Sequence, residues 1–202
     1  MSRAARRALF GGSFDPVHYG HLMVAELLCA LEDLEQVLFL PARRAPHKPG
    51  AVASGPDRLA MLRLARRGNP AFAVSDLELR RPGPSYTIDS VRELGRLWGE
   101  RPTLLVGGDA LLELDTWHEA EALLREARVV AYARPGAEAA AARARELGVR
   151  YHAGLLSSLS SRELRRQARR GLSLRYQVPE PVRRYIESRG LYTRRGTARG
   201  ER

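Results

Sequence analysis

The chain has 202 residues, which suits one domain of ordinary size. Its hydrophobic share of 44% is that of a globular protein, and no apolar run approaches the roughly 20 residues that cross a bilayer. These values exclude a membrane-spanning protein. Because the basic N-terminus is followed by too short an apolar stretch for a signal peptide, we expect a cytoplasmic protein.

The formal net charge is +11, and nearly all of the positive charge is arginine, since Lys48 is the only lysine. A basic balance attracts polyanions such as phosphorylated metabolites, nucleic acid or anionic lipid. The arginines are spread along the chain without a basic arm, which favours solvent-facing helix sides. The single cysteine, Cys29, excludes an intramolecular disulfide and lies in a helical apolar pattern, where we expect a small buried core residue.

The first half of the chain alternates short apolar runs with helical patterns. The first run ends in glycines, and the second is stopped by Pro41. A segment rich in proline, glycine and arginine follows to Pro56 and predicts a loop. In chain order we predict a strand over 8–11, a helix from 18 or 19 to 31, a strand over 36–40, a helix over 57–67, a strand over 72–75, a loop over 81–84 and a helix over 87–98.

The second half continues the alternation and ends in two helices. In chain order we predict a strand over 103–106, helices over 110–114 and 119–126, a strand over 128–133, a helix over 137–147, a strand over 149–152, and helices over 160–170 and 179–188. Residues from 193 onward are polar, so we expect a disordered tail after a single domain over 1–192.

Strands that alternate with helices predict a parallel sheet covered on both faces. We therefore expect an α/β protein with a Rossmann-like doubly wound sheet and a small helical part at the C-terminus. In such sheets ligands bind outside the carboxyl ends of the strands. Three distinctive segments lie there: 11–21 after the first strand, 46–48 after the second and 107–109 after the fourth.

The segment Gly11-Gly12-Ser13-Phe14-Asp15-Pro16-Val17-His18-Tyr19-Gly20-His21 predicts an anion site. His18 and His21 are three residues apart, so they share one face at a helix N-terminus, where free N–H groups and the helix dipole favour an anion. Both imidazoles can donate hydrogen bonds to phosphate oxygens, and Gly20 leaves room for a phosphate. The segment is neither a Walker P-loop nor the dinucleotide fingerprint. The alternatives are two unrelated surface histidines or a metal pair, for which a spacing of four with a nearby carboxylate is more typical.

This segment resembles the signature of the nucleotidylyltransferase superfamily with the His-x-Gly-His motif. From residue 8 to about residue 192, further segments resemble bacterial nicotinate-nucleotide adenylyltransferases in order and spacing. They are Pro46-His47-Lys48, Ser85-Tyr86-Thr87-Ile88-Asp89, Gly107-Gly108-Asp109 with Trp117, Ser160-Ser161-Arg162-Glu163-Leu164-Arg165, and the segment 171–179. One position departs from the family pattern, because Arg162 stands where the family usually has threonine.

The resemblance implies transfer of the adenylyl group of ATP to nicotinate mononucleotide. The products are nicotinate adenine dinucleotide and pyrophosphate, in NAD biosynthesis, by direct in-line attack without a covalent enzyme intermediate. The protein then acts by positioning and by electrostatic stabilisation of an anionic transition state. Mg²⁺ arrives with ATP, because the ion prefers phosphate oxygens and water, and we expect no metal ligands from the protein.

The resemblance also implies which residues form the site. Catalytic roles fall on His18, His21, Lys48 and Arg165. ATP contacts fall on Gly11, Gly12, Ser13, Phe14, Gly20, Gly107, Asp109, Ser160 and Ser161. Contacts to the nicotinate nucleotide fall on Ser13, Lys48, Tyr86, Thr87 and Trp117. Simpler roles stay open for some of them: Asp109, Thr87 and the two serines as helix caps, and Trp117 as a core aromatic residue.

Two other functions stay open. Within the superfamily, the acceptor is nicotinamide mononucleotide or phosphopantetheine instead. In a different class, the chain is a basic nucleic-acid-binding module with an inactive nucleotide site, whose affinity falls steeply with salt. The intact His18, His21, Lys48 and Arg165 count against that second function. The oligomeric state is left open by the sequence.

Overall fold

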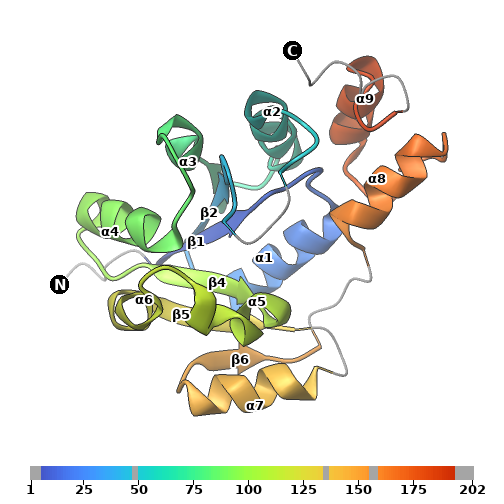
Figure 1. Ribbon diagram of the computed structural model, residues 1–202. Helices are drawn as coiled ribbons and strands as arrows, with labels where there is room; N and C mark the ends of the chain where they lie inside the picture. The colour runs from blue at the N-terminus through green and yellow to red at the C-terminus, as the bar shows by residue number, and fades with distance from the viewer. Residues whose placement is uncertain (1–5, 47–49, 134–136, 155–158, 194–202) are drawn as a thin grey trace.

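The computed structural model describes residues 6–46, 50–133, 137–154 and 159–193. Its strands form one parallel sheet in the order β3-β2-β1-β4-β5-β6 (Figure 1). The strands are β1 (Arg7–Gly12), β2 (Gln36–Pro41), β3 (Phe72–Val74), β4 (Thr103–Gly107), β5 (Arg128–Tyr132) and β6 (Arg150–His152). This order reverses direction between β1 and β4, as in doubly wound dinucleotide-binding folds, and it confirms the predicted fold class.

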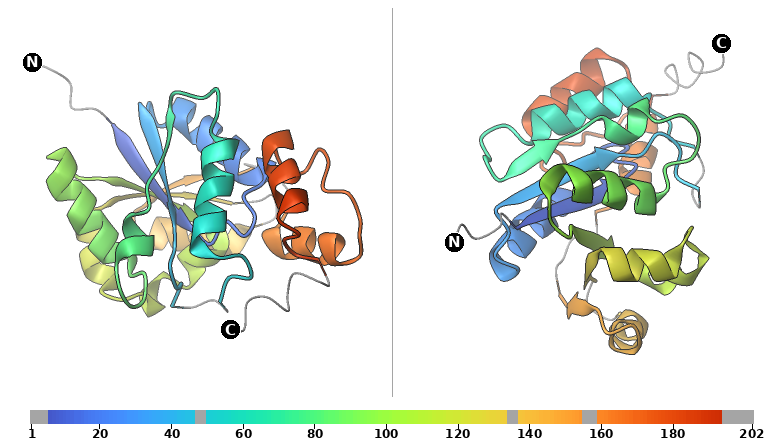
Figure 2. Two further views of the ribbon diagram at one scale, coloured as in Figure 1. Left: turned by 90° about the horizontal axis from the view of Figure 1, so that it is seen from above. Right: turned by 90° about the vertical axis from the view of Figure 1, so that its left-hand side faces the viewer.

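Helices cover both faces of the sheet (Figure 2). One hydrophobic cluster packs one face of the sheet against four helices. These are α1 (Tyr19–Leu31), α2 (Gly55–Ala65), α8 (Ser161–Arg169) and α9 (Glu180–Ser188). A second cluster lies on the other face. It is supplied by α3 (Leu77–Arg80), α4 (Thr87–Trp98), α5 (Gly108–Leu112), the 3-10 turn η1 (Leu114–Thr116), α6 (Ala120–Glu126) and α7 (Glu138–Glu146).

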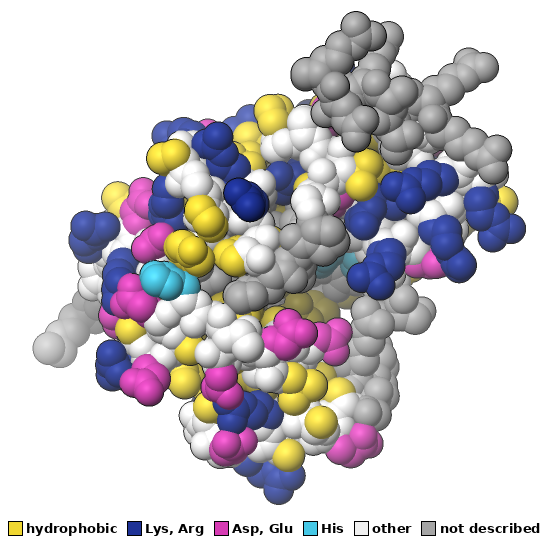
Figure 3. All heavy atoms as spheres, in the orientation of Figure 1, with side chains coloured by type: hydrophobic (Ala, Val, Ile, Leu, Met, Phe, Trp, Pro, Cys, Tyr) yellow, Lys and Arg dark blue, Asp and Glu magenta, His cyan; other side chains and the backbone are white. Residues whose placement is uncertain are grey.

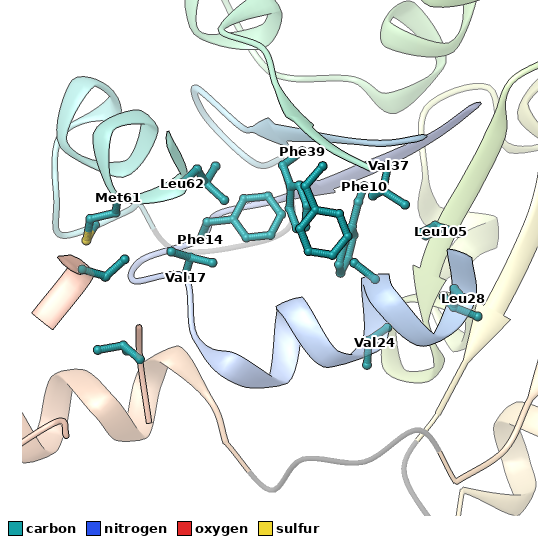
Figure 4. Packing of buried hydrophobic residues seen from close by; sticks show 14 of the residues in the cluster. Phe10, Phe14, Val17, Val24, Leu28, Val37, Phe39, Met61, Leu62 and Leu105 are labelled. Atoms are coloured by element: carbon teal, nitrogen blue, oxygen red, sulfur yellow. The ribbon is translucent and has the colours of Figure 1, made fainter. Parts of the chain in front are cut away.

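Aromatic rings fill the space between the sheet and α1. Phe10 of β1 and Phe39 of β2 lie with ring centroids 5.5 Å apart, and Phe14 packs edge-on against both at 5.6 and 5.7 Å (Figure 4). Each ring is less than 5% exposed. Phe14 comes from the loop before α1, so this core fixes the loop as well as the helix.

The ladder between β1 and β4 is short. It holds only Ala8 opposite Thr103 and Leu9 opposite Leu104, whereas the β1–β2 ladder continues to Gly12 opposite Pro41. The two central strands therefore part toward their carboxyl ends. This separation lies at the point where the strand order reverses, which is where ligands bind in such sheets.

The predicted elements agree with the structure to within about two residues at most ends, and the helix over 87–98 agrees at both ends. Two short elements were missed: α3, a four-residue helix before the loop at 81–84, and the 3-10 turn η1. Cys29 is partly buried rather than fully buried, and burial, together with the charge of Glu26, raises its pKa to about 11. No helix in the described part of the chain is long and apolar enough to cross a membrane. Of the tail predicted over 193–202, all but Thr193 lies outside the described residues.

Candidate active site

The two histidines of the first motif lie together at the N-terminus of α1. His18 is the N-cap residue, and the centroids of its ring and the His21 ring are 3.7 Å apart, with planes inclined by 30°. The backbone N–H of His18 donates to Nδ1 of His21 at 3.3 Å. Since Nδ1 accepts, a neutral His21 ring carries its proton on Nε2, from which it can donate to an anion.

The core holds the His21 ring in place. Phe14 meets it edge-on with centroids 5.1 Å apart, and Phe10 does so at 6.2 Å. Phe14 itself has a positive φ of 48°, and its ring is 2% exposed. Phe14 was predicted to contact ATP, but its side chain is part of the core, so only its backbone can face a ligand.

The glycines of the motif differ in what surrounds them. A Cβ added at Gly11 would meet nothing within 4 Å, so the backbone there is open to a ligand. A Cβ at Gly12 would lie 3.1 Å from the Phe14 ring, so a side chain at that position would press on the core. Gly20 is buried in the first turn of α1. Ser13 is partly buried, and its carbonyl accepts from Arg58 Nη1 at 2.9 Å.

The motif over 11–21 and the first turns of α8 are called the phosphate side below. Asp15 is a buried carboxylate within it, and no role was predicted for this residue. Its Oδ2 accepts from the N–H of Val52 at 2.7 Å, and its Oδ1 accepts from the N–H of Ala53 at 3.0 Å. The hydroxyl of Tyr192 also donates to Oδ1, at 2.8 Å. Asp15 is 2% exposed, so these donors replace the water that an ionised carboxylate requires.

Arg58 is a second residue that the sequence did not single out. It is 2% exposed, although the arginines were expected on solvent-facing helix sides. Its Nε donates to the carbonyl of Ala53 at 3.2 Å, while Nη1 holds Ser13. Burial lowers the pKa of its guanidinium, and the nearby charge of Asp15 opposes that shift. A helical pattern cannot reveal such a residue, because its partner Ser13 lies on a loop 45 positions away in the chain.

Helix α8 docks on the same motif through its first two turns. Ser160 is the N-cap and accepts from the N–H of Glu163, so the cap role is confirmed for Ser160. Ser161 is the first helical residue, and its hydroxyl donates instead to the carbonyl of Pro16 at 2.9 Å. One turn later, Arg165 Nη1 donates to the carbonyl of Asp15 at 2.7 Å and lies 3.6 Å from its Oδ2.

The end of β4 supplies a short helix N-terminus next to β1. The N-cap of α5 is Gly107, and Asp109 lies exposed in the first turn without a capping bond, so the cap alternative for Asp109 is wrong. A Cβ at Gly108 would lie 2.8 Å from that of Ala133 and 3.1 Å from that of Ala140. Glycine at 108 therefore permits α5 to begin in contact with β5 and α7.

The acceptor side is built from α4 and the turn before α6. Thr87 is the first residue of α4 and follows the N-cap Tyr86, so the cap alternative for Thr87 is wrong as well. Trp117 ends η1 and is partly buried against the second cluster, where Tyr86 also packs. The Tyr86 ring stacks on His118 with centroids 4.3 Å apart. His118 was not singled out by the sequence.

The loop after β2 is tied to this acceptor side at its beginning. The N–H of Arg43 donates to the hydroxyl of Ser85, and the N–H of Ser85 donates to the carbonyl of Arg44, each at 2.9 Å. Lys48, with a predicted catalytic role, lies outside the described residues.

Basic residues gather on α8. Arg162, Arg166 and Arg169 of α8 and the C-cap residue Arg170 are exposed. Figure 3 shows basic side chains gathered on the right, over the place of α8 in Figure 1. Arg166 pairs with Glu163 at 2.8 Å. Within the described ranges, no group of three or more His, Cys, Asp or Glu side chains is placed to hold a metal ion.

Comparisons with known proteins agree with this architecture. The model of the cytidylyltransferase-like family matches residues 9–168. A protein of Symbiobacterium thermophilum named "Probable nicotinate-nucleotide adenylyltransferase" is 47% identical, with 98% of this chain and 99% of that protein covered. A protein of Thermus thermophilus with the same name is 45% identical, with 93% and 99% covered.

A solved structure has the same fold. It is the nicotinic acid mononucleotide adenylyltransferase of Plasmodium falciparum complexed with NaAD, with a TM-score of 0.75, 19% identity, and 93% of this chain and 97% of that chain covered. At this identity the likeness shows the fold alone. The family match and the near-full-length relatives go further: the chain belongs to the cytidylyltransferase-like family and, within it, to the bacterial nicotinate-nucleotide adenylyltransferases.

Proposed function

We propose that the protein transfers the adenylyl group of ATP to nicotinate mononucleotide. A phosphate oxygen of the mononucleotide attacks the α-phosphorus of ATP, and the bond from that phosphorus to the bridging oxygen of the β-phosphate breaks. The products are nicotinate adenine dinucleotide and pyrophosphate. The relatives named for this reaction are matched over nearly their whole length, which supports the same reaction here. We place it in the cytoplasm, with ATP supplied as its magnesium complex.

One observation carries the proposal: the stacked His18–His21 pair at the N-terminus of α1, with Arg165 held across the motif by Asp15. The two histidines belong to the motif that follows β1, whose carboxyl end diverges from β4, and Arg165 is hydrogen-bonded to the same motif. The N-terminus of a helix of this length adds oriented N–H groups and the positive end of a dipole. Such an arrangement suits a polyphosphate, whose charge increases on the α-phosphate in the transition state.

We assign the transition-state contact to His21. The hydrogen bond that Nδ1 accepts directs the proton to Nε2, and the Phe14 edge holds the ring plane. A donor fixed in advance need not reorient as charge develops. His18 and Arg165 then bind the other phosphate oxygens, Arg165 from α8 toward the β- and γ-phosphates. Lys48 adds a compact positive charge. Further hydrogen-bond donors come from Ser13, Ser160 and Ser161, and the glycines leave room for the phosphates.

The acceptor pocket is assigned to Tyr86, Thr87 and Trp117. Trp117 offers a ring on which a pyridine can stack. The backbone N–H of Thr87 is in the first turn of α4, where no carbonyl of the same helix can accept it. A helix N-terminus favours a carboxylate over a neutral carboxamide, which supports the acid form of the mononucleotide. Asp109, at the start of α5, is assigned to the ribose hydroxyls of ATP.

The test is a comparison of acceptors at fixed ATP, with dinucleotide and pyrophosphate both measured. We expect nicotinate mononucleotide to give the largest kcat/KM, followed by nicotinamide mononucleotide, with phosphopantetheine inactive. A preference for the amide or for phosphopantetheine would reject the acceptor. Absence of pyrophosphate release with every acceptor, together with salt-sensitive binding of DNA or RNA, would instead support the nucleic-acid-binding module.

A further inference from the structure

The C-terminal segment reaches the phosphate side through one tyrosine. Tyr192 is 2% exposed, and its hydroxyl donates to Asp15 Oδ1 at 2.8 Å. The two residues are 177 positions apart in the chain. Burial raises the pKa of the Tyr192 phenol, and the adjacent Asp15 charge raises it further, so the phenol keeps its proton and remains a donor.

Arg165 touches the same aspartate in two ways. Its Nη1 donates to the backbone carbonyl of Asp15 at 2.7 Å, but the distance from Nη1 to the carboxylate Oδ2 is 3.6 Å, longer than a hydrogen bond. The backbone contact orients the guanidinium. The loose contact to the carboxylate leaves most of its charge for another anion, and its Nε and Nη2 have no partner among the described residues.

We propose that Tyr192 is a positioning residue for the triphosphate of ATP, an inference that rests on the proposed function. Its hydroxyl and the N–H groups of Val52 and Ala53 all donate hydrogen bonds to the Asp15 carboxylate and so stabilise its negative charge. A carboxylate satisfied in this way does not draw Arg165 into a close ion pair. Arg165 therefore faces the β- and γ-phosphates rather than the protein's own acid.

The charges around Asp15 indicate how loss of the Tyr192 hydroxyl would change ATP binding. Without the Tyr192 hydroxyl, Oδ1 loses one of its two donors while remaining buried. The nearest cation able to compensate is Arg165, because Arg58 already donates to the carbonyls of Ser13 and Ala53. A closed Arg165–Asp15 pair would compete with ATP. AMP lacks the β- and γ-phosphates, so its affinity should depend little on this competition.

If Tyr192 only stabilised the fold, its replacement would lower stability without a specific effect on ATP binding. Tyr185 provides the control for such a structural role. Its hydroxyl donates to the carboxylate of Asp57 at 2.8 Å, at the start of α2. Tyr185 comes from the same C-terminal segment and loses an equivalent bond when replaced by phenylalanine. Asp57 has no contact with Arg165 among those described, so Tyr185→Phe should reduce stability without changing phosphate recognition.

The experiment measures the dissociation constants of magnesium-ATP and of AMP by calorimetry without an acceptor. The proteins are the full-length wild type, Tyr192→Phe and Tyr185→Phe. We expect Tyr192→Phe to weaken ATP binding about tenfold, the size of one hydrogen bond to a charged group, with AMP affinity unchanged within about twofold. Tyr185→Phe should leave both constants unchanged. In steady-state assays, Tyr192→Phe should raise the KM for ATP and leave kcat within about twofold.

Each contrary outcome has its own meaning. If the wild type prefers ATP over AMP and Tyr192→Phe keeps that preference, the positioning role is wrong and the proposed function stands. An equal loss of ATP affinity in Tyr185→Phe also rejects the positioning role, because a general loosening of the C-terminal segment would then explain it. If the wild type binds ATP no better than AMP, Arg165 does not bind the triphosphate, and the ATP side of the proposed function is wrong together with the inference.

Discussion

The phosphate side and the acceptor side of the candidate site are built by different means. Around Asp15, buried charged groups and loops are joined by hydrogen bonds between 2.7 and 3.2 Å, and the imidazole pair is braced by core rings. Around Trp117, the side chains are partly exposed and meet mainly by packing, as in the 4.3 Å stack of Tyr86 on His118.

The difference matches the ligands that the two sides are proposed to bind. A polyphosphate requires directed donors that are fixed before the reaction, and buried hydrogen bonds provide that fixation. A pyridine ring requires a flat apolar surface, which packing alone provides. Substitutions on the phosphate side should therefore change turnover or ATP affinity, and substitutions on the acceptor side should change the KM for the mononucleotide.

The largest effect is expected for His21→Ala. The loss of one preorganised donor to the α-phosphate should lower kcat by roughly 10²- to 10³-fold. Steady-state assays with both substrates saturating would measure it, and thermal unfolding would show that the variant is folded. As the matched histidine of the acceptor side, His118→Ala should change the mononucleotide KM more than kcat. Near-normal turnover of His21→Ala would reject the transition-state contact assigned to His21, and with it the difference in turnover expected between the two sides.

An intermediate effect is expected for Trp117→Ala. Stacking of a base on an aromatic side chain is worth about 1–3 kcal/mol, so the KM for nicotinate mononucleotide should rise roughly 5- to 150-fold. The KM for ATP should stay within about twofold, and Trp117→Phe should recover part of the loss. If the KM for ATP rose equally, the two sides would not be separable in the way described.

The smallest effect concerns the pH dependence of stability. The contributions of two buried carboxyls, Asp57 and Glu78, to the free energy of unfolding should change with pH in opposite directions. Desolvation raises the pKa of Asp57, but hydrogen bonds from Ser54 and Tyr185 and the charge of Arg189 lower it below its usual value overall. Its stabilisation is therefore present above the unfolded pKa near 3.8 and lost as pH falls. For Glu78, in α3, desolvation dominates and raises the pKa. Its contribution is greatest below about pH 4.5 and is lost as pH rises through the folded pKa.

Urea unfolding of Asp57→Asn and Glu78→Gln between about pH 2 and 8 checks this, because the Asp57 contribution changes below its unfolded pKa near 3.8. The deficit of Asp57→Asn relative to wild type should grow with rising pH, and the free energy of unfolding of Glu78→Gln should improve relative to wild type over the same range. Parallel curves for the two variants would contradict the assigned environments.

The sequence predicts the strands, their parallel pairing and the histidine pair because each depends on local pattern. The helix over 87–98 was placed well, since it has apolar residues at helical spacing and ends before Gly99, which adopts a left-handed φ of 66°. The four-residue α3 is too short to show a period. Asp15, Arg58 and Tyr192 were missed for another reason: their partners are brought together only by the folded chain, and no spacing marks a buried ion network.

The bond between Asp15 and Tyr192 also bears on how the protein is made. A ribosome delivers β1 and the histidine pair well before Tyr192, which lies 177 positions after Asp15. Domains fold as the chain emerges, N-terminal parts first. The phosphate side therefore lacks this donor until Tyr192 has been synthesised, and a nascent chain that has not reached Tyr192 should bind ATP, a stabilising ligand, less tightly. A polypeptide that ends before Tyr192 would keep the histidine pair and Arg165 and would lack the hydroxyl that donates to Asp15.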